Sequence, residues 1–261
     1  MRMFNISASV GCHKGNKRKN NEDNFYLNGE FKEDPNEKKN LFFNINTNDK
    51  IQVYAVCDGM GGFESGKLAS GIAVNELIRL YRQRINQKKI DEDFLIYAMD
   101  SVDIRISNLH NEDGKKMHAG STCVMLALQK RGMYCLSVGD SRLYLLRNNA
   151  IAQLTRDHTV ALKAENDYRL EKISYDEYLK LSEDKSTLCS YFGLGGIEIY
   201  DLNKELYELN KNDILVAVTD GLYKSLNINE IKDKNYDYVL SNLGQPDVTS
   251  YWINKDDVND L

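Results

Sequence analysis

Three strand-like segments of this chain end in the same way, and this repeated ending constrains the fold more than any other feature. Asp58 in VCDG, Asp140 in VGDS and Asp220 in VTDG each follow an apolar run and precede Gly or Ser. One such aspartate is commonly a turn-former. Three of them favour convergence, because carboxylates at the ends of adjacent strands would crowd together and need a cation or raised pKa values. Oxygen ligands without His or Cys suit Mg²⁺ or Mn²⁺ rather than zinc.

The surrounding pattern predicts one α+β domain of packed layers. Apolar spacing predicts an antiparallel pair of helices over about 68–80 and 94–109. Strands are expected from Phe4, from Ile51 to Cys57, in the three successive runs STCVMLALQ, MYCLSVGD and RLYLLR, and in DILVAVT. The three successive runs predict a meander with hairpin turns. We also expect a long-tipped hairpin over 27–50 and a capped helix over 227–234.

Composition narrows the class of protein. The 261 residues carry 34 Lys+Arg and 39 Asp+Glu, and the resulting net charge of −5 makes nucleic acid an unexpected partner. Five cysteines without paired spacing indicate free thiols in a reducing compartment. No apolar run resembles a signal peptide or a membrane span, so we expect a cytoplasmic protein without a membrane partner.

A basic loop supplies a complement to the carboxylates. Arg18 lies five residues before Asp23 in RKNNED, so one loop delivers a guanidinium together with Glu22 and Asp23. An Arg fork beside bound metal ions suits a tetrahedral phosphate, because two donors match two phosphate oxygens. The alternative for Arg18 alone is a solvated loop charge.

Six ordered motifs together resemble the metal-dependent protein phosphatases of type 2C. They are R-x-x-N-E-D at 18–23, DGMGG at 58–62, GST at 120–122, VGDSR at 138–142, LTRDH at 154–158 and TDGL at 219–222. The resemblance implies a β-sandwich of two antiparallel sheets flanked by α-helices in four layers (α-β-β-α). It also implies a single domain over 1–261, with a variable flap over about 158–194 beside the cleft. The implied activity is dephosphorylation of serine and threonine by water activated between two metal ions.

The resemblance assigns roles to particular residues. Asp58 would bridge two Mn²⁺ or Mg²⁺ ions, and Gly59 would offer its carbonyl to one of them. Glu22, with Asp23 nearby, would hold a metal-bound water, and Arg18 would bind the phosphate. The second metal would take Asp220 and a C-terminal aspartate, for which Asp256 is the best match, while Asp140 and Asp220 would hold a third ion weakly. Substrates would be phosphoproteins, including a Ser/Thr kinase or its targets, and we expect a monomer.

Two departures from the family pattern leave other functions open. Met60 stands where many relatives have a histidine, so no side-chain acid is expected there. The chain also reads NKDDVNDL at its end, without an evident final apolar strand after the terminal ligand. A catalytically impaired binding or scaffold protein is therefore one alternative. A metal hydrolase acting on nucleotides or small phosphoesters is another, because it would use the same chemistry.

Overall fold

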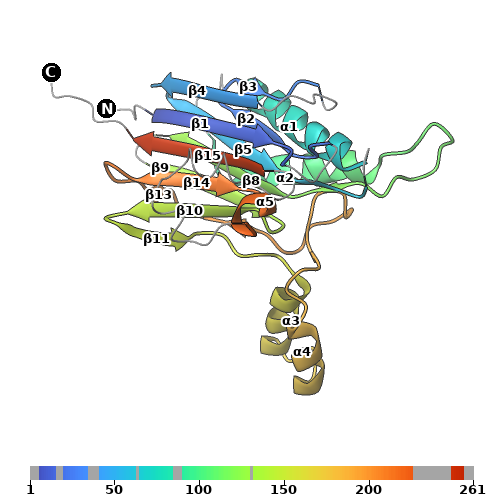
Figure 1. The fold of residues 1–261 in the computed structure, drawn as a ribbon. Helices are drawn as coiled ribbons and strands as arrows, with labels where there is room; N and C mark the ends of the chain where they lie inside the picture. The colour runs from blue at the N-terminus through green and yellow to red at the C-terminus, as the bar shows by residue number, and fades with distance from the viewer. Residues whose placement is uncertain are drawn as a thin grey trace.

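Two stacked antiparallel sheets form the centre of the molecule (Figure 1). The computed structural model describes residues 6–15, 20–34, 41–62, 65–84, 90–129 and 132–225, and the backbone of 248–255. Sheet A runs, in spatial order, β11 (Ala150–Gln153), β10 (Arg142–Arg147), β14 (Ile214–Val218), β15 (Val248–Lys255), β1 (Ile6–His13) and β4 (Leu41–Thr47). Sheet B runs β12 (Asp201–Leu202), β9 (Gly132–Val138), β8 (Cys123–Gln129), β5 (Ile51–Cys57), β2 (Asn24–Leu27) and β3 (Glu30–Phe31), with β13 (Tyr207–Glu208) also on β9. The short β6 (Gly59–Met60) and β7 (Gly120–Ser121) form a separate pair.

The core between the sheets explains why several strands are apolar on both faces. Phe25, Tyr54 and Leu126 of sheet B pack with Leu143 and Leu215 of sheet A between the two layers. Every residue of β5 and β8 is buried, because the opposite face of sheet B is covered by helices. Each face of these strands therefore contributes to a separate hydrophobic cluster.

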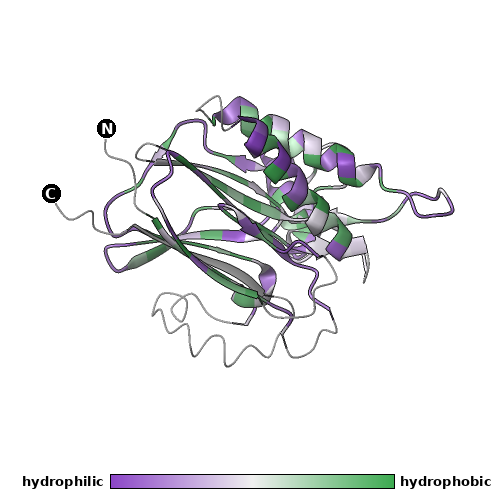
Figure 2. Cartoon of the chain, turned by 90° about the horizontal axis from the view of Figure 1, so that it is seen from above, coloured by the Kyte–Doolittle hydropathy of each residue, from purple (hydrophilic) through white to green (hydrophobic). Residues whose placement is uncertain are grey.

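Helices α1 (Ser65–Arg84) and α2 (Glu92–Ser107) lie along the outer face of sheet B (Figure 2). Asp91 caps α2 by accepting a hydrogen bond from the Phe94 amide at 3.2 Å. Glu76 of α1 ties the two helices together, since its carboxylate binds Arg79 at 2.6 Å and reaches Arg105 of α2 at 2.8 Å. Helices α1 and α2 confirm the antiparallel pair of helices expected from the sequence.

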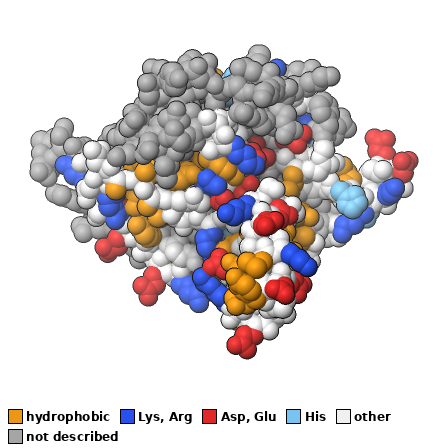
Figure 3. Space-filling model, turned by 60° about the horizontal axis from the view of Figure 1, so that its bottom comes forward, with side chains coloured by type: hydrophobic (Ala, Val, Ile, Leu, Met, Phe, Trp, Pro, Cys, Tyr) orange, Lys and Arg blue, Asp and Glu red, His pale blue; other side chains and the backbone are white. Residues whose placement is uncertain are grey.

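A helical arm projects from the sandwich next to sheet A (Figure 1). It consists of α3 (Val160–Arg169) and α4 (Tyr175–Ser182), and it falls within the segment expected to be the flap. The ring of Tyr168 on α3 stacks against the ring of Tyr178 on α4, with the ring centroids 4.9 Å apart. Tyr175 packs beside both rings. Figure 3 shows hydrophobic side chains on this arm among acidic and basic ones.

Two expected strand connections are wrong. Strands β8 and β9 form a hairpin, but β10 pairs with β14 and β11 in the other sheet, so the meander ends at Val138. Segment 27–50 likewise forms no long-tipped hairpin, because β2 makes a tight hairpin with β3 in sheet B whereas β4 pairs with β1 in sheet A. In both places alternation predicts a strand correctly but does not say which sheet receives it.

A final strand that we did not expect from the sequence is present. β15 lies between β14 and β1, with Val248 opposite His13 and Lys255 opposite Ile6.

The expected helix over 227–234 lies outside the described residues. The α+β sandwich is confirmed, and the single-domain division stays a prediction. Among the described residues, no helix is long and apolar enough to cross a bilayer.

Candidate active site

A polar pocket of about 560 Å³ opens where strand ends of both sheets meet. Its lining includes four of the carboxylates expected from the sequence, and flap residues form part of its wall. The lining residues are Glu22, Asp58, Gly59, Met60, Gly61, Gly62, Thr122, Asp140, Ser186, Thr187, Leu188, Asp220 and Lys224. We call this cavity the acidic pocket.

Glu22 is placed by two glycines that allow very close backbone contact. A Cβ on Gly66, in the first turn of α1, would lie 2.4 Å from Glu22 Oε2. A Cβ on Gly59 would lie 2.0 Å from the Gly66 carbonyl oxygen and 2.7 Å from that of Glu22. The Ser70 hydroxyl donates to the Glu22 carbonyl at 2.6 Å. The start of α1 and the loop before β2 are therefore packed into one unit.

The adjoining Asp23 is fully buried and holds the sheets together at this edge. Its Oδ2 accepts a hydrogen bond from the Thr219 hydroxyl at 2.8 Å, at the end of β14. The buried ammonium of Lys32 donates to the carbonyls of Asn21 and Asp23, at 2.8 and 3.2 Å. Asp23 does not line the acidic pocket, so its observed contacts support the loop that carries Glu22.

Asp58 follows β5 directly and is fixed through its main chain. Its amide donates to Thr122 Oγ1 at 3.1 Å, and its carbonyl accepts from the Thr122 amide at 2.9 Å. Thr122 Oγ1 also lies 2.7 Å from the Ser141 hydroxyl. Thr122 therefore connects the loop after β5 with the loop that carries Asp140.

Asp140 lies where the chain crosses from sheet B to sheet A. Gly139 has a φ of +98°, and a Cβ there would lie 2.6 Å from Thr122 Cγ2, so glycine is required for both reasons. Asp140 Oδ2 accepts a hydrogen bond from the Tyr223 hydroxyl at 3.0 Å. Burial raises the pKa of Asp140, and the negative charge of Asp220 raises it further, against the opposing hydrogen bond from Tyr223.

Asp220 begins α5 (Asp220–Tyr223), directly beyond β14. Its Oδ2 lies 2.5 Å from Lys224 Nζ one helical turn later. Burial lowers the pKa of Lys224, but the hydrogen bond to Asp220 and the nearby negative charges outweigh this effect and raise it. Those charges include Asp140 and Asp58, which line the acidic pocket together with Asp220 and Lys224.

The carboxylates share the pocket without forming a finished ligand set. Among the described residues, no three His, Cys, Asp or Glu side chains lie close enough to hold one ion as they stand. Asp140 and Asp220 are instead turned toward Tyr223 and Lys224. The structure therefore brings Glu22, Asp58, Gly59, Asp140 and Asp220 together, whereas Arg18 and Asp256 lie outside the described residues.

The sequence reasoning missed several residues at this site. Lys224 and Tyr223 could have been found from TDGLYK, because residues three and four after Asp220 share its helical face. Gly66 and Lys32 gave no signal, since their roles depend on contacts between distant segments. The β15 segment VTSYWINK is rich in β-branched and aromatic residues, and this was a detectable strand signal.

Comparison with known proteins places this architecture in a family. Residues 8–172 match the sequence model of the family described as Protein phosphatase 2C. The chain is 25% identical over 199 residues to a serine/threonine phosphatase of Listeria welshimeri, covering 71% of this chain and 72% of that protein. It is 28% identical over 178 residues to a serine/threonine phosphatase of Listeria monocytogenes, covering 67% and 68%.

Solved structures agree with the fold. The Streptococcus agalactiae serine/threonine phosphatase matches with a TM-score of 0.70 at 20% identity, covering 96% of this chain and 100% of that one. The catalytic domain of the phosphatase PstP, in complex with two manganese ions, matches with a TM-score of 0.66 at 18% identity, covering 97% and 100%. Because the family match spans more than half of the sequence, this chain belongs to the protein phosphatase 2C family and is a phosphoprotein phosphatase.

Proposed function

We propose that this chain hydrolyses phosphoserine and phosphothreonine in proteins with divalent cations held in the acidic pocket. The observation that carries the proposal is the gathering of Glu22, Asp58, Asp140 and Asp220 on one cavity at the meeting edge of the two sheets. These side chains come from four separate segments, and in a 2C-family chain they supply a concentrated negative charge without His or Cys.

The donor set fits Mn²⁺ or Mg²⁺. Carboxylate and carbonyl oxygens are the ligands that these hard cations prefer. The raised pKa of Asp140 reflects burial and repulsion from Asp220, and a bound cation would relieve that repulsion. Lys224 already occupies this negative environment as a monovalent charge. On binding a cation, Asp140 would give up its hydrogen bond from Tyr223, and Asp220 would give up its contact with Lys224.

We assign the ligands to Glu22, Asp58, the Gly59 carbonyl and Asp220, for two ions, with Asp140 and Asp220 for a weaker third. Bound divalent cations supply polarisation of the phosphoryl oxygens and a lowered pKa of water. The chain itself orients these groups: Gly66 sets the position of Glu22, and Thr122 fixes Asp58. Arg18 remains our candidate for binding the phosphate. Met60 lines the pocket and has no proton to donate to the leaving alcohol.

The C-terminal ligand is better assigned to Asp247 than to Asp256. β15 starts at Val248, close to Ser250, which lies opposite Val218 at the pocket end of β14, and it ends at Lys255, opposite Ile6. Eight strand residues span about 25 Å. Asp247 immediately precedes the pocket end of β15 in the chain, whereas Asp256 follows its far end.

A substrate panel tests the function. We expect the chain to hydrolyse phosphothreonine and phosphoserine peptides with Mn²⁺ or Mg²⁺, and chelation with EDTA to abolish turnover. Faster hydrolysis of nucleotides would favour the small-phosphoester alternative. Binding of phosphopeptides without turnover at any metal concentration would favour the scaffold alternative. That alternative was suggested by the lack of an evident last strand, and β15 is such a strand.

The cellular setting is also part of this proposal. We infer phosphoprotein substrates that include a Ser/Thr kinase or its targets, a cytoplasmic location and a monomeric state. Sedimentation of the purified chain tests the monomer, and a change in phosphorylation of a co-expressed kinase tests the partner.

A further inference from the structure

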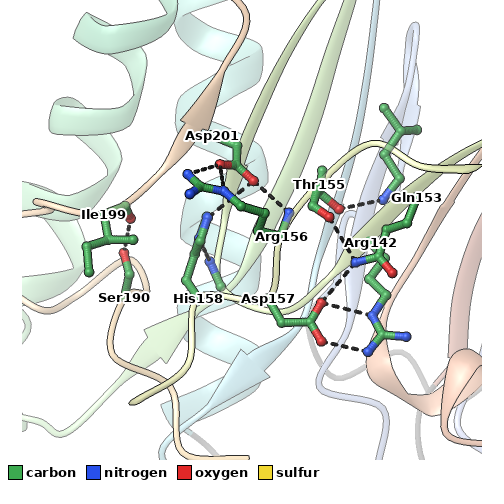
Figure 4. Close-up of polar contacts among 11 residues, drawn as sticks. Arg142, Gln153, Thr155, Arg156, Asp157, His158, Ser190, Ile199 and Asp201 are labelled. Carbon is green, nitrogen blue, oxygen red and sulfur yellow. Dashed lines mark hydrogen bonds and ion pairs between the residues drawn. The ribbon is translucent and has the colours of Figure 1, made fainter. Parts of the chain in front are cut away.

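The dipeptide Asp157-His158 lies at the root of the flap, just before α3, and contacts the Asp140 loop in two ways. Figure 4 shows Asp157 bound to Arg142, and His158 beside Asp201. The mechanism proposed above assigns neither residue a role. Both contacts lead to Asp140, one through the main chain before it and one through side chains beyond it.

The first contact is made by His158, which is fully buried. Its Nδ1 accepts a hydrogen bond from the Gly139 amide at 3.0 Å, and its own amide donates to the Gly139 carbonyl at 3.0 Å. The proton of the neutral ring therefore belongs on Nε2, which faces Asp201 Oδ2 at 3.4 Å. His158 thus holds both polar groups of the residue that precedes Asp140.

The second contact runs through Arg142. Asp157 binds its guanidinium with two hydrogen bonds, at 2.9 Å to Nε and 2.6 Å to Nη2. The guanidinium carbon lies 3.6 Å from the ring centroid of Tyr223, whose hydroxyl donates to Asp140 Oδ2. Asp157 is therefore linked through Arg142 and Tyr223 to the hydrogen bond that Asp140 accepts.

Both ends of the flap meet at the same place. The His158 carbonyl accepts from the Cys189 amide at 2.9 Å, and the Val160 amide donates to the Thr187 carbonyl at 2.9 Å. Thr187 and Leu188 line the acidic pocket. The contacts that hold Asp140 are thus continuous with those that anchor the flap wall of the pocket.

We propose that Asp157 and His158 are positioning residues that set the Asp140 carboxylate and couple its placement to the root of the flap. This inference rests on the proposed function, because it assumes that Asp140 contributes to cation binding and turnover. Its observations are the two-point contact with Gly139 and the Asp157–Arg142–Tyr223–Asp140 series.

The two nitrogens of His158 can be tested separately. In His158→Asn the side-chain oxygen reaches about as far as Nδ1 and can still accept from the Gly139 amide, whereas in His158→Gln the amide reaches about as far as Nε2. We expect His158→Gln to raise the Mn²⁺ concentration for half-maximal turnover at least fivefold, and His158→Asn to raise it less than twofold. Amide exchange of Gly139, followed by NMR without metal, should accelerate at least tenfold in His158→Gln alone.

The Asp157 contact has a matched control on the same strand. Arg147, at the other end of β10, binds Asp213 with the same two distances of 2.9 and 2.6 Å, away from the acidic pocket. We expect Asp157→Asn to weaken calorimetric Mn²⁺ binding at the weakest site at least fivefold. Asp213→Asn should lower the melting temperature and leave Mn²⁺ binding within twofold of wild type.

Equal Mn²⁺ responses in Asp157→Asn and Asp213→Asn would show that the first pair only stabilises the fold, and would overturn the proposal. Indistinguishable Gly139 exchange in the two His158 variants would overturn it as well. If the wild-type chain hydrolyses no phosphoprotein, the proposed function fails, yet exchange and calorimetry still report on the positioning of Asp140.

Discussion

Lys224 Nζ lies 2.5 Å from Asp220 Oδ2, so the acidic pocket carries its own positive charge beside a proposed metal ligand. An ammonium in this place competes with a divalent cation for the same oxygens. We therefore expect Lys224→Met to lower the Mn²⁺ concentration for half-maximal turnover about three- to tenfold, within the energy of one such contact. Metal titration of activity at pH 7 measures the change.

The flap provides a control for Lys224. Lys163 and Asp167 form another Lys–Asp pair one helical turn apart, at 2.9 Å, without lining the acidic pocket. Lys163→Met should leave the Mn²⁺ response unchanged. A weaker Mn²⁺ response in Lys224→Met would contradict the competition argument.

Asp58→Asn should remove activity while the fold remains. The contacts that place Asp58 against Thr122 use main-chain atoms, which asparagine keeps. Losing one negative charge from a cation site should reduce kcat by about 10³-fold or more, a barrier change of roughly 4 kcal/mol. Steady-state kinetics and thermal unfolding check the two parts. Wild-type kcat in this variant would sink the proposed cation site.

The register of β15 predicts which C-terminal aspartate matters. We expect Asp247→Ala to weaken Mn²⁺ binding and lower kcat at least tenfold, because Asp247 precedes the strand end that lies opposite His13. Asp256→Ala, beyond the opposite end, should behave as wild type. Calorimetry and kinetics on the two variants distinguish them, and the reverse ranking would restore Asp256 as the ligand.

Glu76 gives the fold a defined acid sensitivity. The hydrogen bond from Arg79 is the main cause that lowers its pKa, to about 2 from 4.5, against the effect of burial. Because the folded pKa is below the unfolded one, the stabilisation is complete above about pH 4.5 and is lost as the pH falls toward 2. This stabilisation amounts to at most about 3 kcal/mol. Solvent screening reduces it, because the two arginine partners are about half exposed.

Urea unfolding of Glu76→Gln at pH 7 and pH 3 tests this sign. The variant should lose stability at pH 7 and differ less from wild type at pH 3. Glu165→Gln, which breaks the exposed pair with Arg169, is the control and should change little at either pH. An equal loss at both pH values for Glu76→Gln would contradict the assignment.

The acidic residues of the site could be predicted from sequence because each follows a strand whose pattern is readable. Asp58, Asp140 and Asp220 end β-like runs, and the sheet edge brings them to one cavity. The support beneath them could not be predicted in the same way. Gly66 against Glu22 depends on packing between distant segments, and no local periodicity records such a contact.

The arrangement of the sheets was predictable only in part. Alternation identifies β8, β9 and β10, but a three-residue turn after Val138 can either form a hairpin or carry the chain to the facing layer. Here Gly139 adopts its positive φ and the chain crosses. The same crossing places Asp140 between the two sheets, so the failed hairpin prediction falls at a functional position.

The position of β15 has a consequence for biosynthesis. β1 is synthesised before the other strands of sheet A, yet its neighbour on one side is β15, the last of these strands in the chain. Sheet A therefore stays divided into two separate halves until late in translation, with β1 and β4 on one side and β10, β11 and β14 on the other. β15 joins these two halves, so we expect full catalytic competence only after β15 has been synthesised and has inserted between β14 and β1.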